Sequence, residues 1–322
     1  MAISNIRTRR RAAAALSAAV LMATLATALT GAARQPARLA LPAQPSPALP
    51  VQAAFAPSGP YATTTGTATD GTAAYDLYRP AHYAALGFQS PIVTWGNGTN
   101  GSPAQVSVLL RHLASYGFTV IASALPNTGS GREIDAAAHY LAAQNGVASS
   151  VFHGHLNVNE VAAVGTSQGA TGAVRAATSD PALIKTVMTF SLPSAVWAAP
   201  NPDCPTAADC TAHPDALTRP AFFVSTHGFF DSIIASPATE KGFFLSAPVH
   251  AALGIITNSD GKAADHASIE DPAAGGNPGA FLGYATAWLE YQLRGNATAA
   301  GAFTGTHPEL LVNPNWPGSA VK

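Results

Sequence analysis

The residues best suited to do chemistry lie between Glu160 and Arg175, where the sequence reads E-V-A-A-V-G-T-S-Q-G-A-T-G-A-V-R. The apolar run 161–164 is typical of a buried strand, and the small residues that follow favour a helix. Between them, G-T-S-Q-G (165–169) fits the G-x-S-x-G pattern of a nucleophile elbow, a sharp strand-to-helix turn. The alternative is an ordinary turn. We expect an elbow that exposes the Ser167 hydroxyl and leaves the Gln168 amide at a helix N-terminus, where it can stabilise an oxyanion.

A serine hydroxyl becomes a nucleophile when a base takes its proton and an acid orients that base. In proteins with this elbow the chain order is serine, acid, histidine. His266 follows the last expected strand and is the predicted base, whereas its rival His227 precedes that strand. The predicted acid is Asp231, just beyond an apolar strand, with a turn or helix cap as its alternative role. The acids that compete with it are Asp203, Asp209, Asp215, Asp260 and Asp265.

A second oxyanion donor should come from the glycine-rich segment G-N-G-T-N-G (96–101), which follows another apolar strand. The backbone amide of Asn97 is the predicted donor, in preference to that of Gly98. We also expect the side chains of Asn97 and Gln168 to pair across the cleft and make its entrance polar.

The strands and helices that must position these residues can be traced along the chain. Apolar or alternating runs predict strands at 61–70, 75–80, 91–95, 118–122, 161–164, 186–190, 221–225 and 254–257. Helical spacing or composition predicts helices at 106–113, 133–144, after the elbow, at 237–245 and at 281–289. A proline-rich loop is expected over 192–220. Alternation of strands and helices predicts an α/β fold with a mostly parallel central sheet and helices on both faces.

The chain has 322 residues and opens with a segment typical of export. Residues 1–33 hold four arginines and no acid, an apolar run over 12–30 and the small residues 31–33, which together predict a cleaved signal peptide. An uncleaved membrane anchor is the alternative. Residues 34–60 contain seven prolines and predict a disordered or extended linker, so the catalytic domain should span 61–322. The expected location is secreted or periplasmic, by the Sec or the twin-arginine route.

The charge composition limits the kinds of partner that the protein is expected to bind. Removal of the leader takes four of the 16 basic residues and none of the 17 acidic ones, which leaves a net charge of −5. Such a chain has no electrostatic footprint for nucleic acid. We expect a monomer that takes a small or polymeric substrate and has no stable membrane partner after leader cleavage.

Cysteine and histidine positions argue against a metal centre. Cys204 and Cys210 are an even pair in an exported chain, which predicts a disulfide. With only His213 nearby they make no zinc ligand set. The pair His153 and His155 lacks a third ligand and is interpreted as a polar loop. We predict no metal and no cofactor, and we expect the other histidines to lie on the surface: His82, His112, His139, His213, His250 and His307.

Seven short motifs resemble, in order and spacing, those of secreted bacterial polyester hydrolases and cutinase-like esterases. They are Y-R-P (78–80), P-I-V-T-W-G-N (91–97), Y-G-F-T-V-I (116–121), V-G-T-S-Q-G-A (164–170), D-S-I (231–233), H-A-S (266–268) and A-W-L (287–289). These enzymes belong to the α/β-hydrolases, on the branch related to dienelactone hydrolases and chlorophyllases. The resemblance covers about residues 61–303. It implies a cofactor-free serine esterase without a large lid domain, with the triad Ser167, Asp231 and His266 and with Asn97 and Gln168 as backbone oxyanion donors.

Three departures from that family concern the substrate. The polyester hydrolases usually carry an aromatic residue at the position of Asn97, a methionine at that of Gln168, and a tryptophan near residues 191–193. Their C-terminal disulfide also has no counterpart. The sequence therefore predicts a secreted serine hydrolase of carboxylic esters, short-chain or polyester-like. An amidase or peptidase with the same triad and a non-catalytic binding protein on the same scaffold are the alternatives.

Overall fold

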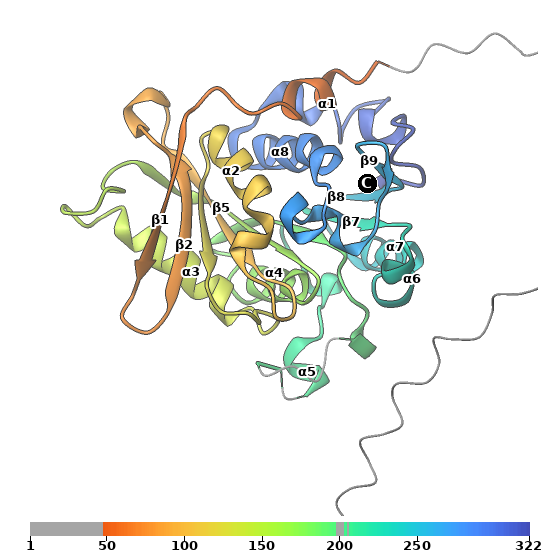
Figure 1. Ribbon diagram of the computed structural model, residues 1–322, viewed down its shortest axis with the longest axis horizontal. Coiled ribbons are helices and arrows are strands. Elements are labelled where there is room, and N and C mark those ends of the chain that lie inside the picture. The colour runs from red at the N-terminus through yellow and green to blue at the C-terminus, as the bar shows by residue number, and fades with distance from the viewer. Residues whose placement is uncertain (1–47, 198–202, 205) are drawn as a thin grey trace, which may run out of the picture. The chain divides into compact units, whose positions relative to one another are not determined.

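The computed structural model describes residues 48–197, 203–204 and 206–322 (Figure 1). The predicted signal peptide and the first part of the predicted linker lie outside the described residues. Among those described, no helix is long and apolar enough to span a bilayer.

A nine-stranded sheet forms the centre of the fold, in the order β1-β2-β4-β3-β5-β6-β7-β8-β11. The pairs from β4 to β8 are parallel, whereas β1, β2 and β11 pair antiparallel at the two ends. The strands are β1 (Thr63–Thr69), β2 (Ala74–Pro80), β3 (Ser90–Gly96), β4 (Thr119–Ser123), β5 (Leu156–Thr166), β6 (Ile184–Phe190), β7 (Ala221–Thr226), β8 (Ala251–Ile256) and β11 (Ala320–Val321). The predicted α/β class with a mostly parallel sheet is confirmed.

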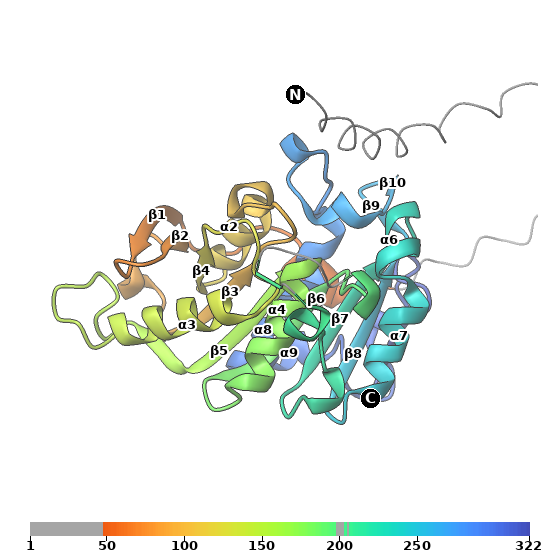
Figure 2. The same cartoon turned by 90° about the horizontal axis from the view of Figure 1, so that it is seen from below.

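Helices cover both faces of the sheet, because successive side chains of each buried strand point to opposite sides. Val93 of β3, for example, belongs to a core cluster that includes residues of α1, α2, α8 and α9, whereas its neighbour Ile92 belongs to the cluster that includes residues of α3, α4 and α7. Figure 2 shows α3, α4 and α7 along one face. The helices are α1 (Pro50–Phe55), α2 (Ser107–Ser115), α3 (Arg132–Gln144), α4 (Gln168–Ser179), α5 (Ala207–Cys210), α6 (Phe229–Ile234), α7 (Pro237–Ser246), α8 (Gly279–Arg294) and α9 (Ala297–Ala300).

The predicted strands and long helices are confirmed, with bounds that differ by a few residues. The short helices α5, α6 and α9, the terminal strand β11, and a small hairpin of β9 (Asn258–Ser259) and β10 (Lys262–Ala263) were not predicted. Each is too short to show a hydrophobic period. The predicted Cys204–Cys210 disulfide is confirmed, and both cysteines are fully buried in the segment between β6 and β7.

The linker prediction is wrong for residues 50–55, which form α1 rather than extended chain. Pro50 occupies the first helical turn, where its missing N–H costs no hydrogen bond. Val51 and Phe55 lie one turn apart and are buried in the core. The carboxylate of Glu309 accepts the amides of Val51 and Gln52 at 2.6 and 2.7 Å, which satisfies two unpaired N–H groups at the helix start.

The surface prediction for His112 is also wrong. His112 is buried at the end of α2, with Nε2 3.0 Å from the carbonyl oxygen of Phe55 in α1. Burial lowers the pKa of His112, since the neutral ring is the cheaper form to desolvate. The error has the same cause as the linker error, because α1 covers this side chain.

Candidate active site

Ser167 stands alone between β5 and α4 in a strained conformation. Its φ of 53° and ψ of −125° lie outside the regions that L-residues normally occupy. Glycines permit this turn: a Cβ on Gly165 would collide with the backbone of Gly169, and one on Gly169 would collide with the backbone of Gly96. The Ser167 amide donates to the carbonyl of Phe190 at 2.8 Å, which ties the turn to β6. The sequence therefore forms a sharp, close-packed strand-to-helix turn with a serine at its apex.

His266 and Asp231 meet although 35 residues separate them in the chain. Nδ1 of His266 lies 2.7 Å from Oδ1 of Asp231. Asp231 is in the first turn of α6, beyond the end of β7, and its carboxylate is fully buried. His266 begins a 3₁₀ turn that follows β8 and the β9–β10 hairpin. A carboxylate at Nδ1 favours the tautomer with the proton on that nitrogen, which leaves Nε2 free to accept one.

The other oxygen of Asp231 is held by three donors. Oδ2 accepts from the Thr226 amide at 3.1 Å, from the Thr226 hydroxyl at 2.6 Å and from the Ser191 hydroxyl at 2.8 Å. These three donors fix the orientation of the carboxylate. Sequence reasoning missed both Ser191 and Thr226.

Asp265 joins the two segments that carry Asp231 and His266. Its Oδ1 accepts from the amides of His266 at 2.8 Å and Phe230 at 3.1 Å, and so caps both the 3₁₀ turn and α6. A Cβ on Gly228 would collide with this carboxylate, which explains the glycine at that position. The D-H-A-S pattern of Asp265 and Ser268 is a capping box, and that pattern was a signal available in the sequence.

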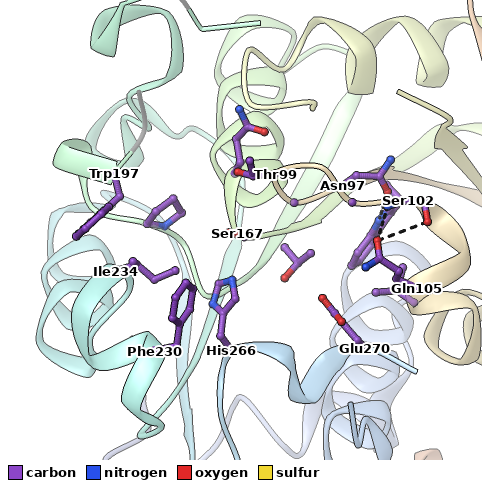
Figure 3. Close-up of a pocket in the computed structure, with 17 residues that line it drawn as sticks. Asn97, Thr99, Ser102, Gln105, Ser167, Trp197, Phe230, Ile234, His266 and Glu270 are labelled. Atoms are coloured by element: carbon purple, nitrogen blue, oxygen red, sulfur yellow. Dashed lines mark hydrogen bonds between the residues drawn. The ribbon is translucent and has the colours of Figure 1, made fainter. Parts of the chain in front are cut away.

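A pocket with a volume of about 340 Å³ brings Ser167 and His266 together. Figure 3 shows Trp197, Ile234 and Phe230 at one side of it, and Asn97, Ser102 and Gln105 at the other. The first group is apolar and the second polar. The pocket lies at the carboxyl ends of the parallel strands, the usual place for a binding site in such sheets. His227 is exposed and is not among the residues that line the pocket, and Nδ1 of His266 is the histidine nitrogen that meets Asp231.

Two backbone N–H groups at this site resemble oxyanion donors. The amide of Gln168 is the first of α4, and that of Asn97 follows the end of β3. Among the described residues neither N–H has an acceptor. Both residues line the pocket with Ser167. Donors without an acceptor beside a nucleophile can bind a developing negative charge.

The expected pairing of the Asn97 and Gln168 side chains is wrong. The Asn97 amide group turns inward, accepts from Trp95 Nε1 at 3.1 Å and donates to the carbonyls of Ser123 and Leu125 at 2.7 and 2.9 Å. The Gln168 side chain points the other way and donates through Nε2 to Asp203 Oδ1 at 3.1 Å. Each side-chain amide bonds to groups on its own side, so the two side chains do not pair with each other.

The segment that carries the Cys204–Cys210 disulfide contacts α4, the helix that follows Ser167. Asp203 accepts the Gln168 side chain through Oδ1 and the Ser130 amide through Oδ2 at 3.0 Å. Arg175 of α4 donates to the carbonyl of Ala208 at 3.1 Å. These contacts attach the segment that carries Cys204 and Cys210 to the residues just after Ser167.

Two glutamates near the site have raised pKa values. Glu240 of α7 is fully buried, accepts the Leu192 amide through Oε1 at 2.6 Å, and leaves Oε2 without a partner among the described residues. Burial raises the pKa of Glu240 well above its usual range. Burial also raises the pKa of Glu270, which lines the pocket, while nearby His266 opposes that rise.

One surface group outside the pocket has metal-ligand chemistry. Asp135, His139 and Asp180 place one ligand atom each within 4.8 Å of one another, with His139 Nε2 already 2.9 Å from Asp180 Oδ2. Cys204 and Cys210 offer no thiolate, because they form the disulfide.

His155 of the predicted polar loop is exposed and stacks on Tyr83, with ring centroids 5.1 Å apart.

Comparison with protein-family models gave no match, and neither did comparison with curated protein sequences. The fold defines an α/β protein with a mostly parallel sheet and a buried disulfide. Its pocket is lined by a strained serine and by a histidine that is paired with a buried aspartate.

Proposed function

We propose that this protein is a serine hydrolase of carboxylic esters with an α/β-hydrolase fold. The observation that carries the proposal is the 2.7 Å contact of His266 Nδ1 with the buried Asp231 carboxylate, in a site where His266 shares its pocket with the strained Ser167. The strand order supports the fold, because an antiparallel β2 precedes the parallel strands and the crossovers place the serine after β5. The motifs shared with cutinase-like esterases support the same conclusion.

The proposed reaction proceeds through an acyl-enzyme. Ser167 Oγ attacks the ester carbonyl while His266 Nε2 takes the hydroxyl proton, and Asp231 stabilises the imidazolium that forms. The amides of Asn97 and Gln168 donate to the tetrahedral oxyanion. When the C–O bond breaks, His266 returns the proton to the leaving alcohol. Water then attacks the acyl-serine with the same base, which releases the acid and restores Ser167.

Secretion is part of the proposal. The buried Cys204–Cys210 disulfide supports an oxidising compartment, since disulfides are rare in reducing cytosol. The arginine-bearing apolar leader in the sequence supports the same location.

A fluorophosphonate probe tests the nucleophile. Wild type should be labelled and Ser167→Ala should not, whereas Ser246→Ala, an exposed serine at the end of α7, should label like wild type. Equal labelling of Ser167→Ala would contradict the assignment. No labelling of wild type would favour a binding protein instead.

Matched substrates test the reaction class. p-Nitrophenyl acetate and butyrate should be hydrolysed faster than the corresponding p-nitroanilides, and Ser167→Ala should hydrolyse neither. Faster cleavage of the anilides would favour an amidase or peptidase.

A further inference from the structure

Glu270 places a carboxylate in the pocket that the proposed reaction does not use. It lines the pocket together with Ser167 and His266. Figure 3 shows its side chain reaching into the space between His266 and Gln105. Among the described residues its carboxylate has no hydrogen-bond or ion-pair partner. An unpaired carboxylate beside the reacting centre is a site for an opposite charge.

The segment that carries Glu270 is held firmly in place. The next residue, Asp271, donates its amide to the carbonyl of Gln105 at 2.6 Å. The Asp271 carboxylate accepts the Ser107 hydroxyl at 2.6 Å and the Val108 amide at 2.8 Å, at the start of α2. The backbone next to Glu270 is therefore fixed by hydrogen bonds to Gln105, which lines the pocket, and to the start of α2.

The other charges around the pocket do not neutralise Glu270. Among the described residues, no lysine or arginine lines the pocket. Asp231 already has a partner in His266 and three further donors, and the Asp271 carboxylate is bound to α2. Glu270 is therefore the acidic side chain of the pocket lining that has no partner among the described residues.

We propose that Glu270 makes this pocket selective for esters that carry a cationic group, and unfavourable for esters that carry a free carboxylate. This inference rests on the proposed ester hydrolase function. The substrate places its apolar part against Trp197, Phe230 and Ile234, and its cationic group, such as a quaternary ammonium, beside Glu270. A carboxylate at the same place meets a like charge in a partly desolvated site, which costs binding energy.

Isosteric esters test the proposal at about pH 8, above the ordinary carboxyl range. Butyrylcholine and 3,3-dimethylbutyl butyrate have nearly the same shape and differ by one positive charge. The measured quantity is the ratio of their kcat/KM values, which cancels any general effect of a substitution on catalysis. Glu270→Gln keeps the side-chain shape and should lower this ratio about fivefold, the upper range for a partly exposed charge pair.

A control variant and an ester that carries a carboxylate complete the test. Asp215→Asn removes the same charge at an exposed position that does not line the pocket, and it should leave the ratio unchanged. The butyrate ester of 4-hydroxy-2,2-dimethylbutanoate, which carries a carboxylate on the alcohol part where butyrylcholine carries its cation, should be a poorer substrate than 3,3-dimethylbutyl butyrate in wild type and should recover in Glu270→Gln. An equal ratio in wild type and Glu270→Gln, or a preference of wild type for the ester with the carboxylate on its alcohol part, would overturn the proposal. If no ester is cleaved and no probe label is seen, the hydrolase function itself is overturned.

Discussion

Asp231 divides its two carboxylate oxygens between different partners, with Oδ1 2.7 Å from Nδ1 of His266 and Oδ2 surrounded by N–H and O–H donors. The donors on Oδ2 come from Thr226 at the end of β7 and from Ser191 just after β6. The carboxylate therefore cannot rotate without losing bonds to two strands. The contact with Oδ1 in turn orients the imidazole ring of His266.

Asp231→Asn should abolish the proposed esterase activity without unfolding the protein. The three donors hold an oxygen at the Oδ2 position, so the new NH₂ group must face His266 Nδ1. A donor there forces the proton onto Nε2, and the ring can no longer accept a proton from Ser167. We expect kcat for p-nitrophenyl butyrate to fall by roughly 10⁴-fold, the effect that the same substitution has in a Ser-His-Asp triad. A loss smaller than about tenfold, with an unchanged circular dichroism spectrum, would remove Asp231 from the mechanism.

Gln168→Met should keep most of the activity, because the proposed oxyanion donor is the backbone amide. The substitution removes the bond to Asp203 and also a buried carbonyl oxygen that has no partner among the described residues. These two effects oppose each other in stability. Loss of an oxyanion donor typically costs a hundredfold or more in kcat, and we expect a loss far below that. If kcat falls by roughly a hundredfold while KM and the melting temperature hold, the side chain rather than the amide acts on the oxyanion.

Gly169→Ala should destabilise the protein, and Gly242→Ala should not. A Cβ at Gly169 meets the backbone of Gly96, which cannot move aside as a flexible side chain can. We expect a loss of about 1–3 kcal/mol in the free energy of unfolding. Gly242 lies exposed inside α7 with open space around it, where alanine should stabilise by about 0.5–1 kcal/mol. Urea denaturation measures both, and equal effects of the two substitutions would contradict the close packing at the elbow.

The free energy of unfolding of the Glu240→Gln variant should rise relative to that of wild type as pH rises. Burial raises the pKa of Glu240, so the folded protein keeps a proton that the unfolded chain releases above the ordinary value of 4.5. The contribution of Glu240 to stability is therefore complete below that pH and is lost as pH rises toward the folded pKa. Glutamine does not ionise and can still accept the Leu192 amide.

Urea denaturation of both proteins between about pH 4 and pH 9 measures this difference. Within the affected window the two free energies of unfolding should diverge by up to about 1.4 kcal/mol per pH unit. A difference that stays constant across the range would show that Glu240 is not a buried neutral acid.

Much of the fold was predictable because its main elements have strong local patterns. Apolar runs such as 161–164 mark strands buried on both faces, and the amphipathic spacing near Leu109 and Leu113 marks α2. The order of serine, acid and histidine along the chain then selected His266 and Asp231, which the structure brings into contact. Local pattern and chain order were sufficient for these assignments.

The remaining details depend on contacts between distant residues, which local patterns do not encode. The orientation of the Asn97 side chain is set by carbonyls 26 and 28 residues away. Ser191 reaches Asp231 from another strand, and from a backbone with a φ of 52° that a serine rarely adopts. The helix α1 forms where Glu309, more than 250 residues away, accepts its first amides.

The four tryptophans of the chain differ sharply in their access to solvent. Trp95, Trp288 and Trp316 are at most 2% exposed, whereas Trp197 is 51% exposed and lines the pocket. A collisional quencher such as iodide should therefore act mainly on the fluorescence of Trp197. A molecule that fills the apolar side of the pocket should shield that indole from the quencher. The fluorescence of Trp197 should therefore report whether the pocket is occupied.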